Sequence, residues 1–246
     1  EALKLALECL RLIDDKEAFR ISSLDSLIGS ILYRRGMPEA SLLFAKESVE
    51  RSQSGPYASG IALQASTALA ELYESMSQHQ LAEEYLKVAE QAFEKAPEGL
   101  EHIRSELRLG VVRARTKINQ QEYREAESLL EKNLELYSQQ PFLATAVLSQ
   151  SLMLLARVYS DTGRVEDAPR KFNEAIDRVE GDGDYMQTEG LRVKFDDERR
   201  ELYDSAIEFE FRNGSPDAAW TYLQKYRAKL FLEFLAAFNP HIEPAR

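Results

Sequence analysis

A recurring interval between alanines constrains the fold of this chain more than any other feature. Alanines stand at equivalent positions in segments whose apolar residues recur every three or four places, as on the packed face of a helix. The intervals between successive members of the series are 38, 42, 44, 42 and 51 residues. A period that stays near 42 residues through the middle of the chain indicates an internal structural repeat. The alanines are Ala2, Ala40, Ala82, Ala126, Ala168 and Ala219.

The clearest copy of the repeat runs from Leu155 to Ile176. It reads as two short helices joined at Gly163, with Ala156 on the first helix and Ala168 on the second. Small residues at these two positions let the helices approach closely, while larger aromatic side chains fill the space beside them. The segment therefore predicts a helix-turn-helix unit, and its spacings serve as the template for the other copies.

The template predicts a partial unit at residues 1–15 and complete units at about 18–53, 57–95, 98–138, 141–180 and 186–238. Together they form one expected superhelical domain over residues 1–246. The first unit lacks a first helix and the sequence begins without Met. We therefore expect the chain to be a piece of a longer protein.

The unit at 18–53 differs from the template in its loop. Gly29 is its expected close-approach residue, Gly36 its turn, and Ala40 and Phe44 the signature of its second helix. The loop before Ala40 is one residue shorter than in the template, which leaves the register of this unit open.

Prolines support the same register. Pro56, Pro97 and Pro141 each stand just ahead of a predicted first helix, where the missing N–H is harmless. Pro169 departs from this pattern, because it falls early in a second helix and should bend that helix or delay its start. After Gly181–Asp184, which reads as a turn, two long helices are expected at about 186–212 and 215–238.

The composition agrees with an all-α chain. Only 11 glycines and 8 prolines occur in 246 residues, too few for a sheet built on tight turns. The net charge of -11 disfavours non-specific binding to nucleic acid or to anionic lipid. The single cysteine, Cys9, excludes an internal disulfide and fits a reducing compartment, so we expect a cytoplasmic protein. No apolar run reaches the roughly 18–20 residues that span a bilayer.

No pattern in the chain predicts catalysis, and we expect no cofactor and no metal. The three histidines are far apart in sequence, and Cys9 stands at a helix-packing position where a small buried residue is expected. HExxH, GxSxG and phosphate-loop patterns do not occur. Acidic residues around Gly181–Asp184 lack the spacing of an EF-hand, which favours a solvated turn over a calcium loop. The chain by itself is therefore not expected to be an enzyme.

The helix-turn-helix pattern resembles the tetratricopeptide (TPR) repeat. This resemblance implies a right-handed α-solenoid whose first helices line a concave wall, with a protein or peptide partner in the groove. The wall would also carry Glu71 and Glu74. Arginines on it suit an acidic peptide or a chain terminus, or they pair with carboxylates of adjacent helices. The candidate binding residues of the groove are Arg104, Arg108, Arg115, Asn119, Gln150 and Arg157.

The last predicted helix carries a dense apolar stripe. A solenoid needs a polar end for solubility, so a stripe of this kind should pack against a downstream domain, a partner or a second copy. Alternatively, it folds back onto the long helix before it. The stripe consists of Leu230, Phe231, Phe234, Leu235 and Phe238.

The stretch Arg199–Phe238 also resembles the last TPR segment that precedes a CHAT domain in bacterial TPR–CHAT proteins. The match lies in Tyr226–Leu230. It implies that a caspase-like cysteine protease domain follows, and it assigns no catalytic residue to this chain. We therefore expect an interaction scaffold, the recognition or regulatory arm of a larger bacterial protein. The alternative is a peptide- or ligand-sensing module that regulates a C-terminal caspase-like effector.

Overall fold

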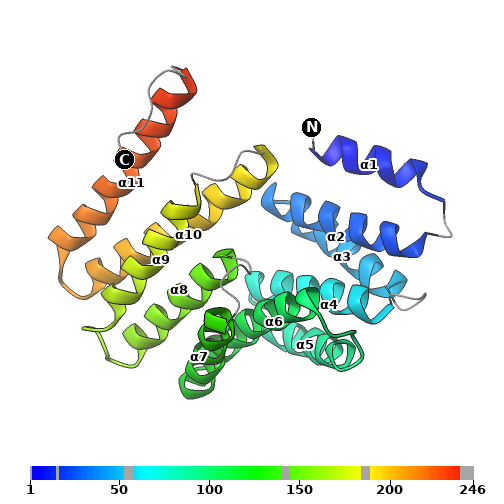
Figure 1. Ribbon diagram of the computed structural model, residues 1–246, viewed down its shortest axis with the longest axis horizontal. Coiled ribbons are helices and arrows are strands. Elements are labelled where there is room, and N and C mark those ends of the chain that lie inside the picture. The colour runs from blue at the N-terminus through cyan, green and yellow to red at the C-terminus, as the bar shows by residue number, and fades with distance from the viewer. Residues whose placement is uncertain (1, 15–16, 53–57, 140–144, 184–188, 239–246) are drawn as a thin grey trace. The chain divides into compact units, whose positions relative to one another are not determined.

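The structure is a computed structural model of residues 1–246, and it describes all of them except residues 1, 15–16, 53–57, 140–144, 184–188 and 239–246. The described residues form eleven α-helices and no strand (Figure 1). This confirms the all-α prediction. The chain divides into two compact units, residues 1–143 and residues 144–246, which are described separately.

The first unit contains seven helices. After α1, they form three hairpins, in which α2 packs on α3, α4 on α5 and α6 on α7. Neighbouring hairpins join because α4 also packs on α2 and α6 also packs on α4. The helices are α1 (Ala2–Leu12), α2 (Ala18–Arg34), α3 (Pro38–Arg51), α4 (Ala58–Ser75), α5 (His79–Phe93), α6 (Leu100–Asn119) and α7 (Tyr123–Gln139).

The second unit contains two hairpins, in which α8 packs on α9 and α10 on α11. Helix α10 joins the two hairpins, because it also packs on α8 and α9. The two long helices predicted at the end of the chain are α10 and α11. The helices are α8 (Thr145–Asp161), α9 (Ala168–Gly183), α10 (Glu189–Arg212) and α11 (Pro216–Phe238).

Every hairpin turns through one residue with a left-handed backbone. The predicted turn glycines Gly36, Gly163 and Gly214 have φ of 72°, 80° and 77°. Ser77 and Gln121 take the same position in the other two hairpins, with φ of 59° and 64°. A side chain in this conformation costs about 1–2 kcal/mol, so glycine is the residue that the geometry favours. The sequence did not mark Ser77 and Gln121 as turn residues.

The left-handed residues show the register of the repeat. Ala82, Ala126, Ala168 and Ala219 each follow one of them by five positions, and all four are buried. In the hairpin of α2 and α3 this position belongs to Ser41, which is fully buried, so the register predicted from Ala40 is wrong by one residue. Serine is small enough for the close contact.

The one-residue shift changes the role of the predicted α3 signature. Ala40 and Phe44 are only partly buried, and they pack against the cluster of Ala6, Ile28 and Leu32 on α1 and α2. The same cluster explains a second correction. Helix α1 packs through Ala6, which leaves Cys9 exposed instead of buried.

The start of α9 is delayed, which is one of the two alternatives that the sequence predicts for Pro169. Helix α9 begins at Ala168, five residues after the left-handed Gly163, whereas the other second helices begin two residues after theirs. Pro169 therefore lies in the first turn, where it breaks no helical hydrogen bond. At its other end, α9 continues through Gly183, so the turn predicted from Gly181 is wrong for residues 181–183. Asp184 lies outside the described residues.

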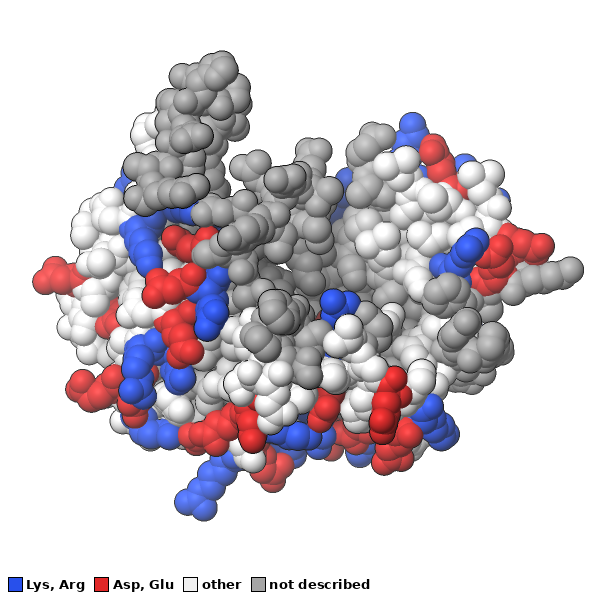
Figure 2. Space-filling view, viewed as in Figure 1, with Lys and Arg blue, Asp and Glu red and all other residues white. Residues whose placement is uncertain are grey.

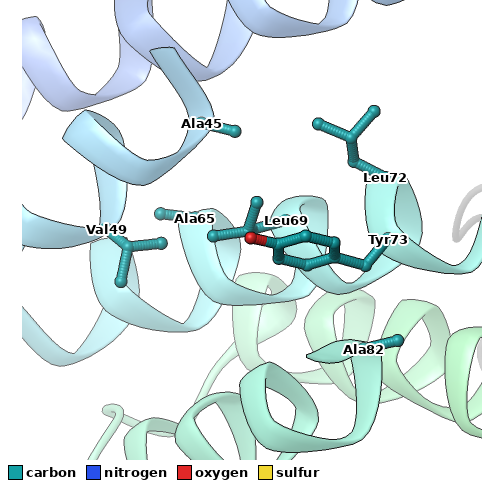
Figure 3. Packing of buried hydrophobic residues seen from close by; sticks show 7 residues of the cluster. All are labelled: Ala45, Val49, Ala65, Leu69, Leu72, Tyr73 and Ala82. Carbon is teal, nitrogen blue, oxygen red and sulfur yellow. The ribbon is translucent and has the colours of Figure 1, made fainter. Parts of the chain in front are cut away.

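Aromatic and small residues alternate in the core of the first unit. Figure 3 shows Tyr73 of α4 beside Leu69, between Ala45 of α3 and Ala82 of α5. The Tyr73 ring also stacks on Tyr85 at a centroid distance of 5.5 Å. This is the predicted division of roles, in which alanines permit close approach and aromatic rings fill the remaining space.

Close approach is tightest at two glycines. A Cβ on Gly29 would lie 3.2 Å from the carbonyl oxygen of Ser41, and Ser41 Oγ donates to the Gly29 carbonyl oxygen at 2.6 Å. Gly29 is therefore the close-approach residue that the sequence predicts. A Cβ on Gly110 would lie 2.3 Å from Oδ1 of Asn133, a buried residue of α7.

A buried carboxyl group lies between α2 and α3. Asp25 is almost fully buried, and its Oδ2 lies 3.3 Å from Nε of Arg51. Burial raises the pKa of Asp25 from 3.8 to about 6, an effect that Arg51 partly offsets and Glu47 increases. At neutral pH the carboxylate is therefore ionised at a cost to the fold.

We expect Asp25→Asn to stabilise the protein by about 1–3 kcal/mol at pH 7.5. Because the folded pKa lies above the unfolded one, the cost of ionised Asp25 is complete above about pH 6. It disappears as the pH falls toward 4, so the stability difference between variant and wild type should shrink over that range. Urea unfolding at several pH values measures it. Asp204→Asn, at an exposed ion pair, is the control; a difference that does not change with pH would contradict the assignment.

Candidate partner-binding surfaces

The first candidate surface lies where α4 and α6 pack side by side, and we call it the α4–α6 face. Polar side chains of both helices meet there. Figure 2 shows basic and acidic side chains interleaved over the visible side of the molecule, in keeping with paired charges. The residues of the α4–α6 face are Glu71, Glu74, Arg108, Arg115 and Asn119.

A two-pronged ion pair forms the centre of this face. Arg108 donates from Nε to Oε1 of Glu71 at 2.7 Å and from Nη2 to Oε2 at 2.6 Å. The side chains remain 43% and 36% exposed, so water reaches both. The charge of Glu71 raises the pKa of Arg108, against a smaller opposing effect of burial. The predicted alternative, pairing with a carboxylate of an adjacent helix, is therefore the arrangement found for Arg108.

Two N–H groups of Arg108 are used in this pair. A guanidinium carries five, and the other three donate to no side chain among the described residues. Glu71 therefore orients the guanidinium plane while leaving donors available on a half-exposed side chain.

A second polar connection lies one helical turn further along α4. The Glu74 carboxylate is buried, and its Oε2 accepts from Nδ2 of Asn119 at 2.6 Å and lies 3.0 Å from Nδ1 of His79. Its Oε1 has no hydrogen-bond partner among the described residues. The group links α4, α5 and α6, which makes it a structural connection beneath the face more than a contact surface.

The other predicted groove residues are distributed over both units. Arg104 is exposed and Arg115 half-buried on α6, and each interacts with other residues. Gln150 and Arg157 belong to α8 in the second unit, where Arg157 Nε lies 3.7 Å from Oδ2 of Asp161. Of the six predicted groove residues, four therefore lie on α6 and two on α8.

Sequence reasoning missed part of this network. It placed Glu71 and Glu74 on the same wall but did not include them among the binding residues. Their partners lie 37 and 45 residues later, close to one repeat, and this spacing was the available signal. Nothing in the sequence pointed to His79, whose role depends on its position just after the Ser77 turn.

The second candidate surface is the stripe on α11. Leu230, Phe231 and Phe234 are 41%, 60% and 59% exposed, and Leu235 is half-buried. The alternative in which the stripe folds back onto α10 is therefore wrong for Phe231, whereas Phe234 interacts with another residue. The side chain of Phe238 lies outside the described residues.

In the described part of the chain, three or more His, Cys, Asp or Glu side chains nowhere gather closely enough to hold a metal ion. Among the described helices, none has both the length and the apolar character needed to cross a lipid bilayer.

Comparison with known proteins agrees with this architecture. No family model and no curated protein matches the sequence. The crystal structure of BtubC (BKLC) from P. vanneervenii is similar at 17% identity, covering 99% of this chain and 92% of that one, with a TM-score of 0.61. A structure of nearly identical TPR-like repeats from Podospora anserina is similar at 19% identity, covering 89% and 97%, with a TM-score of 0.53. The chain therefore has the fold of a TPR-like α-solenoid.

Proposed function

We propose that this chain is a protein–protein interaction scaffold whose α4–α6 face binds a carboxylate of a partner, either an acidic side chain or a chain terminus. The observation that supports this most directly is the Arg108 guanidinium, held by Glu71 and still half exposed. Fork-shaped donors of this kind suit carboxylates, and prior orientation lowers the entropy lost on binding.

Glu71 has two opposing effects in this proposal. It positions Arg108, and its negative charge repels an incoming carboxylate. The partner therefore either adds to the outer donors of Arg108 or displaces Glu71. In both cases neutralising Glu71 favours the acidic partner.

The test measures fluorescence anisotropy of a labelled octaglutamate peptide with a free C-terminus. We expect Arg108→Ala to weaken binding about tenfold, or roughly 1.4 kcal/mol, and Glu71→Gln to strengthen it. The control is Arg200→Ala, which removes another exposed arginine that pairs with a carboxylate, that of Asp204. Equal binding by wild type and Arg108→Ala, with unchanged circular dichroism, would refute the proposal.

The resemblance of Arg199–Phe238 to the last TPR segment before a CHAT domain supports a role within a larger protein. A chain with an exposed apolar face on α11 suits the recognition arm of a larger bacterial protein, or a sensor that regulates a C-terminal caspase-like effector. A recognition arm and a sensor differ in whether binding of the partner changes the C-terminal helices. Hydrogen exchange in α10 and α11 should change on addition of the peptide if the chain is a sensor, and should stay unchanged if it is a passive scaffold.

A further inference from the structure

Three buried serines form hydrogen bonds across the hairpin of α2 and α3, and we call them the serine seam: Ser22, Ser41 and Ser48. Ser22 Oγ donates to the carbonyl oxygen of Ser48, and Ser48 Oγ donates to that of Ser22, both at 2.8 Å. Ser41 Oγ donates to the Gly29 carbonyl oxygen at 2.6 Å. The pair of Ser22 and Ser48 lies at the open end of the hairpin, which is the end opposite the Gly36 turn. Hydroxyl groups therefore join the two helices at that end.

The neighbouring hairpin of α4 and α5 has apolar residues at the positions of the serine seam. Counted from the left-handed residue of each turn, they are Leu63, Ala82 and Ala89, and all three are buried. When two helices separate, water replaces the hydrogen bonds of a serine, whereas a leucine or an alanine loses its burial without such a replacement. Separation should therefore cost less free energy in the α2–α3 hairpin than in the α4–α5 hairpin.

Both helices of the α2–α3 hairpin also pack on other neighbours. Ile28 of α2 lies in an apolar cluster with α1, and Val49 of α3 lies in one with α4 (Figure 3). Ala40 and Phe44 of α3 join the cluster of α1 and α2, and both lie in the half of α3 nearest the turn. The open end can therefore separate while the turn end keeps its apolar contacts.

A buried charge lies at the same open end. Asp25 follows Ser22 by about one helical turn, and its Oδ2 lies 3.3 Å from Nε of Arg51 on α3. Arg51 also pairs with Glu47 at 3.1 Å, so Asp25 shares its cation with a second carboxylate. These two residues of α3 are the charged groups that act on Asp25 among the described residues, and α1 and α4, which also pack on α2, supply none. Separation returns the Asp25 carboxylate to water, which favours the open end when Asp25 is ionised.

We infer that the open end of the α2–α3 hairpin separates locally while the rest of the first unit stays folded, and that acidification closes it. The serine seam lowers the cost of separation at every pH, and ionised Asp25 lowers it further at neutral pH. A proton on Asp25 removes that second contribution, so the closed hairpin is favoured in acid. The hairpin is thus a pH-sensitive element of the first unit. This inference does not depend on the α4–α6 face.

Asp25 sets the direction and the size of the pH effect. Burial raises its pKa from 3.8 to about 6 in the closed hairpin, and the water around the open hairpin returns it toward 3.8. The cost of ionised Asp25 is therefore complete above about pH 6 and falls as the pH drops toward 4. The opening equilibrium should accordingly decrease about tenfold between pH 7.5 and pH 5.0. The three histidines of the chain lie outside α2 and α3.

Amide hydrogen exchange of the whole chain, corrected for the intrinsic exchange rate at each pH, tests the inference. The separated helix ends should unwind, because short helices are marginal in water without packing. At pH 7.5, residues 22–28 and 46–52 should be protected at least tenfold less than the equivalent residues 63–69 and 87–93. Their exchange should be almost independent of low urea concentrations, because local separation exposes little surface. At pH 5.0 their protection should rise about tenfold.

Two variants separate the effect of Asp25 from other effects of pH. Asp25→Asn should raise the protection of residues 22–28 and 46–52 at pH 7.5 at least tenfold and remove its pH dependence, since the amide stays neutral. Asp204→Asn, at an exposed ion pair of α10, should change neither.

Three outcomes would overturn the inference. Equal protection of the two hairpins in wild type would show that the serine seam does not weaken the open end. Exchange that depends on urea as strongly as that of α4 and α5 would show that the opening is not local. A rise in protection at pH 5.0 that persists in Asp25→Asn would show that Asp25 does not control the opening.

Discussion

Gly110→Ala should lower the free energy of unfolding by about 3 kcal/mol. The new Cβ would lie 2.3 Å from Oδ1 and 2.9 Å from Cγ of Asn133, so one of the two helices must shift. Asn133 cannot simply rotate away, because it is buried and its Nδ2 donates to the Leu107 carbonyl oxygen at 2.8 Å. Overpacking and the loss of a buried hydrogen bond each cost about 1–3 kcal/mol. Urea unfolding followed by circular dichroism measures the change.

A double-mutant cycle isolates the contact. Asn133→Ala removes the atoms that meet the new Cβ, so Gly110→Ala should cost much less in that background than in wild type. Gly60→Ala is the control for helix propensity, since no described atom lies within 4 Å of its Cβ position. Alanine there should be neutral or slightly stabilising. Equal costs of Gly110→Ala in both backgrounds would contradict the close approach of α6 and α7.

The second large effect is expected in the other unit. Phe172→Ala should destabilise it by about 3–5 kcal/mol, the usual cost of removing a buried aromatic ring. Phe172 of α9 is almost fully buried, and its ring lies 5.6 Å from that of Phe209 on α10. The ring therefore connects the two hairpins of this unit as well as filling its own.

The matched control is Phe211→Ala. Phe211 lies on α10 close to Phe209 in sequence, but it is 72% exposed, so its truncation should change stability by less than about 0.5 kcal/mol. Thermal unfolding and hydrogen exchange in α9 and α10 distinguish the two variants. Similar losses for both phenylalanines would show that burial in this unit does not follow the packing described.

Much of the fold could be predicted because its signals are local. Helix formation depends on residues three and four apart, and the turns depend on single residues that tolerate a left-handed backbone. Gly36, Gly163 and Gly214 therefore marked three of the five turns. The alanines that follow the turns gave the register in four hairpins, because only a small residue permits that helix contact.

The errors arose where another residue performs the same task. Ser77 and Gln121 take a left-handed backbone without being glycine, which tertiary packing enforces at a cost. Ser41 replaces the expected alanine, since its hydroxyl is satisfied by the Gly29 carbonyl oxygen in the close contact. Cys9 was expected to be buried from its residue type and spacing, but α1 packs through Ala6. In each case a competing residue met the same physical requirement.

The sequence by itself determined the helices, the repeat period and the positions that share a helical face, because these follow from separations of a few residues along one chain. Only the tertiary structure decided which of those faces are covered and which charges are paired. Arg108 meets Glu71 across 37 residues, and the pairing depends on how two helices pack. Phe231 of α11 is exposed because that helix packs on α10 through its other side, where Tyr226 stacks on Tyr203.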